Sequence, residues 1–571
     1  MWVLPFLYYN HAYPITTFYQ EWGAALLGIC ALPLLVTGRY WQQPEIPRAV
    51  MLPISFLLLI LIQYLFHRIE NFDQMLLLAL YLLWAALLIM LGQRLRVELG
   101  LPAVVTWLAV FLLVGAELQT LVGILQHFHW RTFLDSVVTS KVSNAVYGNI
   151  AQPNHFANYV VLGLASLGLL FVLGKLRAWH AALLATPMLF VLVLSGSRSS
   201  WLYLIWLMAS AYLWQRRDPA NRLLLRYALV LLVGFGLMHL LVQIPWLSGV
   251  SGTNTVERMF GDAGSGGIRL ALWRESWFIF SQFPILGAGV GQFAWQHFNL
   301  DIAQHNIIVN GLYNNAHNLI IQVAAETGLV GVAVMLLTLA LWAWPQRTQP
   351  RSVYHWWGYA VLMVMLIHSL LEYPLWYAYF IGIAAITLGL FDFTGFKLEL
   401  RNLGRLSVAT MLLLGAVSLS QAAVGYGKLE KALALRIPAS NDASYVPQIR
   451  QMLVEAHGYP LISSYAELFL TGMIEPSADS LKDKMMLNEH AMHFVPIASV
   501  VYREALLLQL AGRTDEAKSQ LEKSIWAWPN DFAVASADLT NLARKDPGHF
   551  AALLEFATQK NEEYQRAIRT K

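Results

Sequence analysis

Three side chains in short motifs of the sequence could do chemistry, a histidine and two arginines. His317 directly precedes one such stretch, within "YNNAHNLIIQVAAETGLVG". Arg198 is the single charge in the short turn "SGSRSS", and Arg269 lies in "GGIRLALWRES". An imidazole exchanges its proton near neutral pH, and a guanidinium can bind a phosphate through two hydrogen bonds. These residue types favour a site that binds an anion, with His317 in catalysis or substrate contact.

Two further motifs gather polar side chains. The stretch "GNIAQPNHFAN" contains Gln152, Asn154 and His155 within about two helical turns. The stretch "HSLLEYPLWYAYF" contains Glu372 and Tyr373 at a turn. The alternatives are structural, because the first motif also suits a polar helix cap with a proline at the helix start. The second motif also suits an aromatic belt at a membrane interface.

Neighbours of the first three residues are weaker candidates. Arg274 follows Arg269 by five residues and either helps to bind a phosphate or pairs with Glu275. Asn318 adjoins His317, and Gln322 and Glu326 follow one and two turns further along. The alternative for Arg198 is a cation that extends its head toward water from a helix end. We expect contact with the substrate from both polar motifs and from these neighbours, at Gln152, Asn154, His155, Arg274, Asn318, Glu372 and Tyr373.

These motifs interrupt a chain with the composition of a membrane protein. Of its 571 residues, 57% are hydrophobic and 13% are charged, whereas soluble domains carry about 25% charged residues. Stretches near the length of about 20 apolar residues that a membrane-spanning helix needs predict an all-α, polytopic fold with about twelve transmembrane helices. Their centres are 22–36, 49–65, 76–91, 103–125, 156–173, 181–195, 199–214, 223–241, 318–342, 356–371, 375–391 and 406–423.

Lysine and arginine concentrate in alternate loops, and this pattern predicts the orientation. The basic loops, predicted to be cytoplasmic, carry Arg39, Arg48, Arg94, Arg96, Lys175, Arg177, Arg216, Arg217, Arg222, Arg347, Arg351, Lys397, Arg401 and Arg405. All five motifs then face outward, together with a large loop at 242–317. Residues 1–21 are also expected outside, which would suit a short additional N-terminal helix absent from this chain.

The composition changes near residue 425. We expect a membrane domain over 1–425, including the outward loop, and a soluble helical domain over 426–571. Within the latter, "VYREALLLQLAGRTDEAKSQLEKSIWAWPND" is typical of a tetratricopeptide-type hairpin. This domain either guides a protein acceptor or is a passive cap.

Other function classes are disfavoured. A net charge of +4 is too small to suggest nucleic-acid binding, and Cys30 is the single cysteine, so neither an intramolecular disulfide nor a cysteine-type metal centre is expected. His127 and His129 have no carboxylate at ligand spacing. We therefore expect no metal and no cofactor.

The motifs, in this order, resemble those of bacterial protein O-oligosaccharyltransferases of the PglL type, which glycosylate pilins and belong to one superfamily with O-antigen ligases and polymerases. The resemblance runs from about Trp22 to Ala423, and the pattern around His317 is the part shared across the superfamily. The motifs around Gln152 and Tyr373 look specific to the protein-glycosylating branch.

The resemblance implies transfer of a glycan from undecaprenyl diphosphate to an acceptor hydroxyl, at the periplasmic face of the bacterial inner membrane. Arg198 and Arg269 would then hold the diphosphate, and His317 would be the general base. Gln152 and Tyr373 would orient donor or acceptor. Direct attack on the anomeric carbon would invert its configuration, and no metal need be invoked.

Three alternatives remain open at this point. An O-antigen ligase would use a sugar of the lipid A core as acceptor, and a polymerase would extend a lipid-linked glycan. A secondary transporter or flippase would instead place functional polar residues near the bilayer midplane and show an internal repeat. Here the polar motifs gather at one face, and no convincing repeat is visible.

Overall fold

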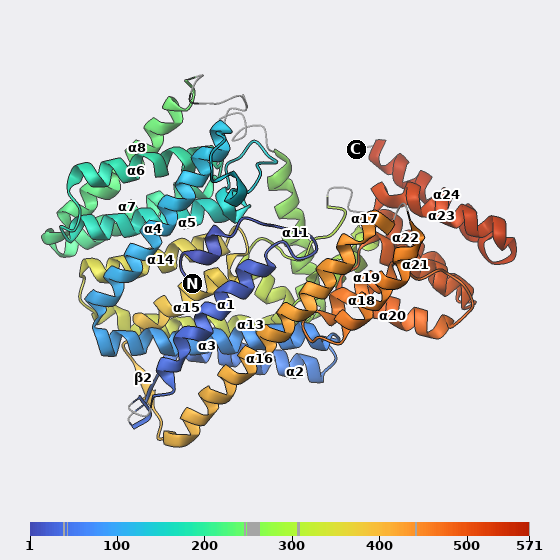
Figure 1. The fold of residues 1–571 in the computed structure, drawn as a ribbon, viewed down its shortest axis with the longest axis horizontal. Coiled ribbons are helices and arrows are strands. Elements are labelled where there is room, and N and C mark those ends of the chain that lie inside the picture. Colours follow the sequence, from blue (N-terminus) through green and yellow to red (C-terminus); the bar gives the residue numbers. More distant parts are fainter. Residues whose placement is uncertain are drawn as a thin grey trace.

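The computed structural model describes the chain except residues 38, 39, 43, 245, 246, 248–262, 305–308, 440, 441, 570 and 571. Arg39 and part of the predicted outward loop, residues 245, 246, 248–262 and 305–308, therefore lie outside the described residues. The described part is all-α apart from one short antiparallel ribbon, in which β1 (Glu45–Pro47) pairs with β2 (Gly395–Lys397). The C-terminal helices gather at one end of the molecule (Figure 1).

The longer helices of the first part include those that carry the predicted apolar stretches, together with helices of the predicted outward loop. They are α1 (Phe18–Ala31), α2 (Met51–Leu65), α3 (Phe72–Leu99), α4 (Leu101–Phe128), α5 (Pro153–Val172), α6 (Ala178–Leu194), α7 (Ser199–Arg217), α8 (Arg222–Leu241), α11 (Ala263–Gln282), α12 (Phe293–Gln304), α13 (Leu319–Ala343), α14 (Val353–Ser369), α15 (Ala378–Leu390) and α16 (Arg401–Ala434).

Each of the twelve predicted spans coincides with one of these helices. Among the described residues, eight helical segments are long and apolar enough to cross a membrane, and α6 and α15 are shorter apolar helices. A polytopic membrane protein is therefore supported, while the count of twelve stays a prediction. The difference arises at α6, α7, α14 and α15, which are shorter or more polar than the others.

Helix α5 lies at the centre of the membrane part and is buried along most of its length. The side chain of Phe6, which belongs to the short 3-10 helix Leu4–Leu7, stacks on Tyr159 of α5 at 3.9 Å between ring centroids. The Tyr159 hydroxyl donates to the Trp2 carbonyl oxygen at 2.6 Å. Because α5 is covered on all sides, the residues at its N-terminus are held in a fixed position.

The C-terminal part continues from α16 without an intervening linker. Its helices are α17 (Arg436–Ala439), α18 (Val446–His457), α19 (Ser463–Thr471), α20 (Leu481–Phe494), α21 (Ala498–Leu510), α22 (Thr514–Ala527), α23 (Phe532–Lys545) and α24 (Pro547–Arg569). The predicted boundary at 425/426 falls inside α16, so the division into two domains stays a prediction. Helices α21 and α22 pack as a hairpin around Gly512, whose φ is +75°; the tetratricopeptide assignment is likewise still a prediction.

Candidate active site

The carboxylate of Glu372 is the centre of the polar cluster at the end of α14. The residue lies between α14 and the short 3-10 helix Pro374–Trp376, and its backbone N–H donates to the His368 carbonyl oxygen at 2.8 Å. Its side chain is 5% exposed. A carboxylate so far from water needs several hydrogen-bond donors.

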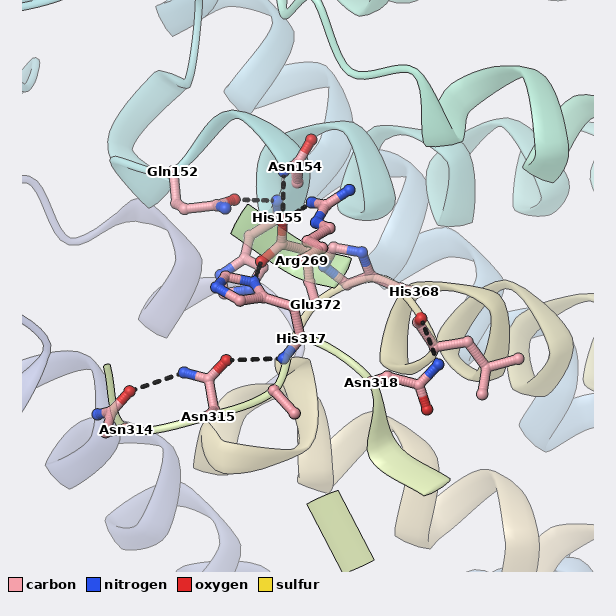
Figure 2. Close-up of polar contacts among 12 residues, drawn as sticks. Gln152, Asn154, His155, Arg269, Asn314, Asn315, His317, Asn318, His368 and Glu372 are labelled. Carbon is pink, nitrogen blue, oxygen red and sulfur yellow. Dashed lines mark hydrogen bonds and ion pairs between the residues drawn. The ribbon is translucent and has the colours of Figure 1, made fainter. Parts of the chain in front are cut away.

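Three donors from three distant elements supply them, as Figure 2 shows. Asn154 Nδ2 at the start of α5 donates to Glu372 Oε1 at 2.8 Å, and Arg269 Nη2 on α11 donates to the same oxygen at 2.7 Å. His317 Nδ1 lies 2.9 Å from Glu372 Oε2. The structure thus brings together residues from four of the five motifs. His155, the neighbour of Asn154 in the sequence, also lines this cluster.

The pKa of the Glu372 carboxyl is the balance of opposing effects. Burial alone would raise this pKa, but the hydrogen bond and charge of His317 and the charge of Arg269 outweigh it and leave the pKa below its ordinary value. An ionised carboxylate only accepts hydrogen bonds, so the 2.9 Å contact requires a proton on His317 Nδ1. The Nε2 atom of neutral His317 is then the proton acceptor.

The backbone around His317 is held in an uncommon conformation. Its φ is +50°, in the left-handed region that non-glycine residues seldom adopt. The His317 N–H donates to Asn315 Oδ1 at 3.1 Å, and the Ala316 N–H donates to Gln322 Oε1 at 2.7 Å. The strain, typically about 1–3 kcal/mol, is therefore offset by local hydrogen bonds that aim the imidazole at Glu372.

Asn318 and Gln152 act as helix caps in the structure. Asn318 Oδ1 accepts from the N–H groups of Ile320 and Ile321, and its Nδ2 donates to the Leu370 carbonyl oxygen at 3.2 Å. Gln152 Oε1 accepts from the His155 N–H at the start of α5. The side-chain oxygen of Gln152 therefore makes the helix-cap contact that was the structural alternative for its motif. Both caps lie at the start of helices next to site residues.

His155 and Tyr373 form the aromatic wall of the cluster. The His155 ring is 1% exposed and meets the rings of Tyr373 and His368 edge to face, at 5.9 and 5.1 Å between centroids. The Tyr373 ring meets His317 in the same way at 5.4 Å. Burial and the charge of Glu372 raise the pKa of the Tyr373 phenol, so this hydroxyl keeps its proton.

Arg198 and Arg274 are the other two arginines that the sequence motifs singled out, and they are not among the three donors to Glu372 described above. Arg198 is exposed at the start of α7. Its helix is tied to the cluster, because Tyr203 Oη lies 2.8 Å from His368 Nδ1. Arg274 is exposed on α11 and, five residues from Arg269, lies about 140° around the helix axis. One helix face cannot present both guanidinium groups.

The sequence motifs did not single out His368, which lies in the same cluster. His368 precedes Glu372 by four residues, the spacing at which side chains meet on a helix, and this signal was available. The carboxylate of Glu372 contacts Asn154, Arg269 and His317, and its expected contact with the substrate stays a prediction. Glu326 accepts from the Gly291 N–H at 2.9 Å and so fixes a loop, away from the cluster.

Comparisons with known proteins cover the same segments. The O-Antigen ligase family model matches residues 181–336, which include Arg198, Arg269 and His317. The Protein glycosylation ligase model matches residues 146–171. The C-terminal model of the Virulence factor membrane-bound polymerase family matches residues 356–542, from α14 into the C-terminal helices.

A curated relative matches most of the chain. The General O-oligosaccharyltransferase of Acinetobacter baylyi is 26% identical over 402 residues, which cover 68% of this chain and 67% of the relative. With the family models, this match confirms the resemblance to PglL-type O-oligosaccharyltransferases and the O-antigen ligase superfamily.

Proposed function

We propose that this chain, as a relative of the O-oligosaccharyltransferases and O-antigen ligases, is a glycosyltransferase that moves a preassembled glycan to a protein. In full, the proposal is transfer from undecaprenyl diphosphate to a serine or threonine hydroxyl of a periplasmic, pilin-like protein. The enzyme would be a multi-pass protein of the bacterial inner membrane with its site facing the periplasm. The predicted orientation supports this placement, because the basic loops lie opposite the cluster.

The observation that carries the proposal is the hydrogen bond between His317 Nδ1 and the carboxylate of Glu372. A buried carboxylate that accepts from His317 Nδ1 sets the tautomer and the ring orientation, and stabilises the imidazolium once it forms. The His317 side chain is 23% exposed, so its ring is open to a reactant. This arrangement is that of a general base prepared for a weakly acidic nucleophile.

The proposed reaction is a single displacement. His317 Nε2 takes the proton of the acceptor hydroxyl while the hydroxyl oxygen forms a bond to the anomeric carbon. The bond from that carbon to the diphosphate oxygen breaks, and undecaprenyl diphosphate leaves with the electron pair. Attack opposite the leaving group inverts the anomeric carbon. A positioned base contributes about 10²–10⁴-fold to such a step.

The arginines supply the positive charge. Arg269 is 36% exposed and holds Glu372 through Nη2, which leaves other donors of its guanidinium for a diphosphate. Arg198 would approach the diphosphate from α7. Charge that develops on the leaving group would be stabilised by these fixed cations, without a metal. Gln152 and Tyr373, which border the cluster, would orient donor or acceptor through the amide and the protonated hydroxyl.

The test is transfer in proteoliposomes that contain the full chain, a diphosphate-linked glycan lipid and a pilin, followed by mass spectrometry of the pilin. His317→Gln is expected to lower the rate about 10²–10⁴-fold. The matched control is His549→Gln, because His549 Nδ1 also meets a carboxylate, that of Asp546 at 2.7 Å, but on the C-terminal helices. Wild-type rates in His317→Gln would refute the base assignment.

The acceptor is tested in the same vesicles. The O-Antigen ligase match over 181–336 favours a second candidate acceptor, a sugar of the lipid A core. Offering a pilin and a lipid A core together separates the two. Glycan on the lipid alone would overturn the protein acceptor and keep the glycosyltransferase; movement of the donor across the bilayer without any transfer would overturn both.

A further inference from the structure

The helix α12 of the outward loop belongs to the core of the C-terminal helices. Phe298 of α12 is 2% exposed and packs in one apolar cluster with Met492 of α20, Val501 of α21 and Ala527 of α22. The C-terminal helices are therefore completed by a segment that lies some 200 residues earlier in the sequence.

Polar and aromatic contacts reinforce this packing. Lys523 Nζ on α22 donates to Asn299 Oδ1 on α12 at 3.2 Å. The Trp295 ring stacks on His493 of α20 at 4.2 Å between centroids. Trp295, Phe298 and Asn299 of α12 thus contact α20 and α22, and these contacts hold α12 against the C-terminal helices.

The chain between α12 and α13 makes a second set of contacts with the same helices. The Gly311 N–H donates to the Ala527 carbonyl oxygen at the end of α22 at 2.7 Å. Asn310 Nδ2 donates to the hydroxyl oxygen of Tyr564 on α24 at 3.2 Å. Gly311 has a φ of +96°, which a side chain would strain.

From Gly311 the chain reaches the candidate base within six residues, about 20 Å at most. Val309, just before this stretch, and Ala316, just before His317, are both fully buried in one cluster with Leu272 of α11. Trp273 Nε1 donates to the Ala316 carbonyl oxygen at 3.0 Å. A displacement of residues 310 and 311 would therefore be transmitted to His317, because the short stretch between them is held by buried contacts.

The C-terminal helices also contact the membrane part just before α3, through His493 and through α19. His493 Nδ1 lies 2.8 Å from Glu70 Oε2, just before α3. The Ser464 hydroxyl of α19 donates to Asn71 Oδ1 at 3.0 Å. The helices that hold residues 310 and 311 therefore have their own footing on the membrane part.

We infer that the helices α19–α24 are a positioning element of the candidate active site, which hold His317 in place through Asn310 and Gly311. The inference rests on the proposed function of His317. Asn310 and Tyr564 are positioning residues, because they act on the base through the intervening chain. A role in docking the protein acceptor alone would make these helices dispensable for a small acceptor, whereas a positioning role makes them matter for every acceptor.

The experiment compares Asn310→Ala, Tyr564→Phe and the double variant with wild type in the full chain. Each is assayed with a folded pilin and with a short serine-containing peptide. Loss of the hydrogen bond between Asn310 and Tyr564 is expected to lower kcat about 2–10-fold for both acceptors, with KM for the glycan donor unchanged. The matched controls are Asn541→Ala and Tyr445→Phe, whose side chains lie elsewhere on the C-terminal helices.

Amide hydrogen exchange of residues 309–318, without donor or acceptor, gives a readout besides activity. The variants are expected to exchange faster at Gly311 and Ala316, and the controls are not. Unchanged kcat despite faster exchange would overturn the inference, and so would a change confined to KM for the pilin. If wild type transferred no glycan, the proposed function would fail, and exchange at Ala316 would still decide whether the C-terminal helices hold this chain.

Discussion

Two carboxylates of this protein have similar partners in very different surroundings. Glu372 in the candidate active site accepts from His317, Arg269 and Asn154. Glu467 on α19 meets His457 Nε2 at 2.8 Å and His490 Nδ1 at 2.7 Å. In both, the basic partners outweigh burial and lower the carboxyl pKa.

The difference lies in where the partners come from and whether their charge is permanent. The partners of Glu467 are 10 and 23 residues away, on α18 and α20, and both histidine side chains are nearly half exposed. The partners of Glu372 are 55, 103 and 218 residues away, and one is an arginine. Glu467 thus joins neighbouring helices, whereas Glu372 joins distant elements around a histidine open to a reactant.

Neutralising each carboxylate should separate catalysis from stability. Glu372→Gln loses the charge that stabilises an imidazolium at His317, so we expect glycan transfer to fall about 10²-fold or more. Glu467→Gln should leave kcat within about twofold while lowering the stability of the C-terminal helices by about 1–3 kcal/mol. Transfer assays and thermal unfolding of both variants measure this contrast, which equal losses of transfer would contradict.

The helix caps beside the two carboxylates form a second matched pair. Asn318 caps α13 after His317, and Asn71 caps α3 and accepts from Ser464, near Glu467. Replacing either by Ala should cost about 1 kcal/mol of stability. Asn318→Ala should also lower kcat, and by more than Asn71→Ala, because Asn318 adjoins His317 whereas Asn71 acts on it only through the C-terminal helices. Asn318→Asp, which keeps the capping oxygen, should restore most of the stability. Equal kcat in the two alanine variants would show that the cap does not position His317.

The response to pH should also distinguish the two regions. Glu467 raises the pKa of His490 above its ordinary value of 6.5, so this pair stabilises the protein fully below 6.5 and less as pH rises through the raised pKa. The carboxyl contribution is lost as pH falls below 4.5. Because His490 is 43% exposed, solvent screening limits its effect to less than about 1 kcal/mol. Thermal midpoints at pH 5.5 and 8.5 should differ less for His490→Gln than for wild type; an identical difference would exclude this pair as its source.

The smallest effect is expected for Arg274. Its side chain is exposed on a different face of α11 from Arg269. Arg274→Ala should keep transfer within about twofold of wild type, whereas Arg269→Ala removes a permanent charge from Glu372. Assaying both variants at the same donor concentration tests this. A loss of more than tenfold in Arg274→Ala would place a second cation in the site.

Much of the candidate site was predictable because its residues occur in short motifs at helix ends. Local patterns indicated that Gln152, Arg269, His317 and Tyr373 mattered, and the structure brings all four to the cluster or its border. Arg198 was also singled out by its motif; it is exposed at the start of α7, the helix whose Tyr203 contacts His368. Arg274 was singled out by its proximity to Arg269 in the sequence; it lies about 140° around α11 from Arg269, and its contact with the substrate stays a prediction.

By itself, the sequence determined the membrane class, the apolar helices and the polar residues at their ends. Hydropathy and helix caps depend on a few neighbouring residues, so they can be recognised without knowing what packs where. Two features became visible in the folded chain alone. Glu372 accepts hydrogen bonds from residues of three other elements, and α12 completes the C-terminal core. Such contacts depend on how whole helices pack, and no local pattern encodes which of many polar side chains will meet across 218 residues.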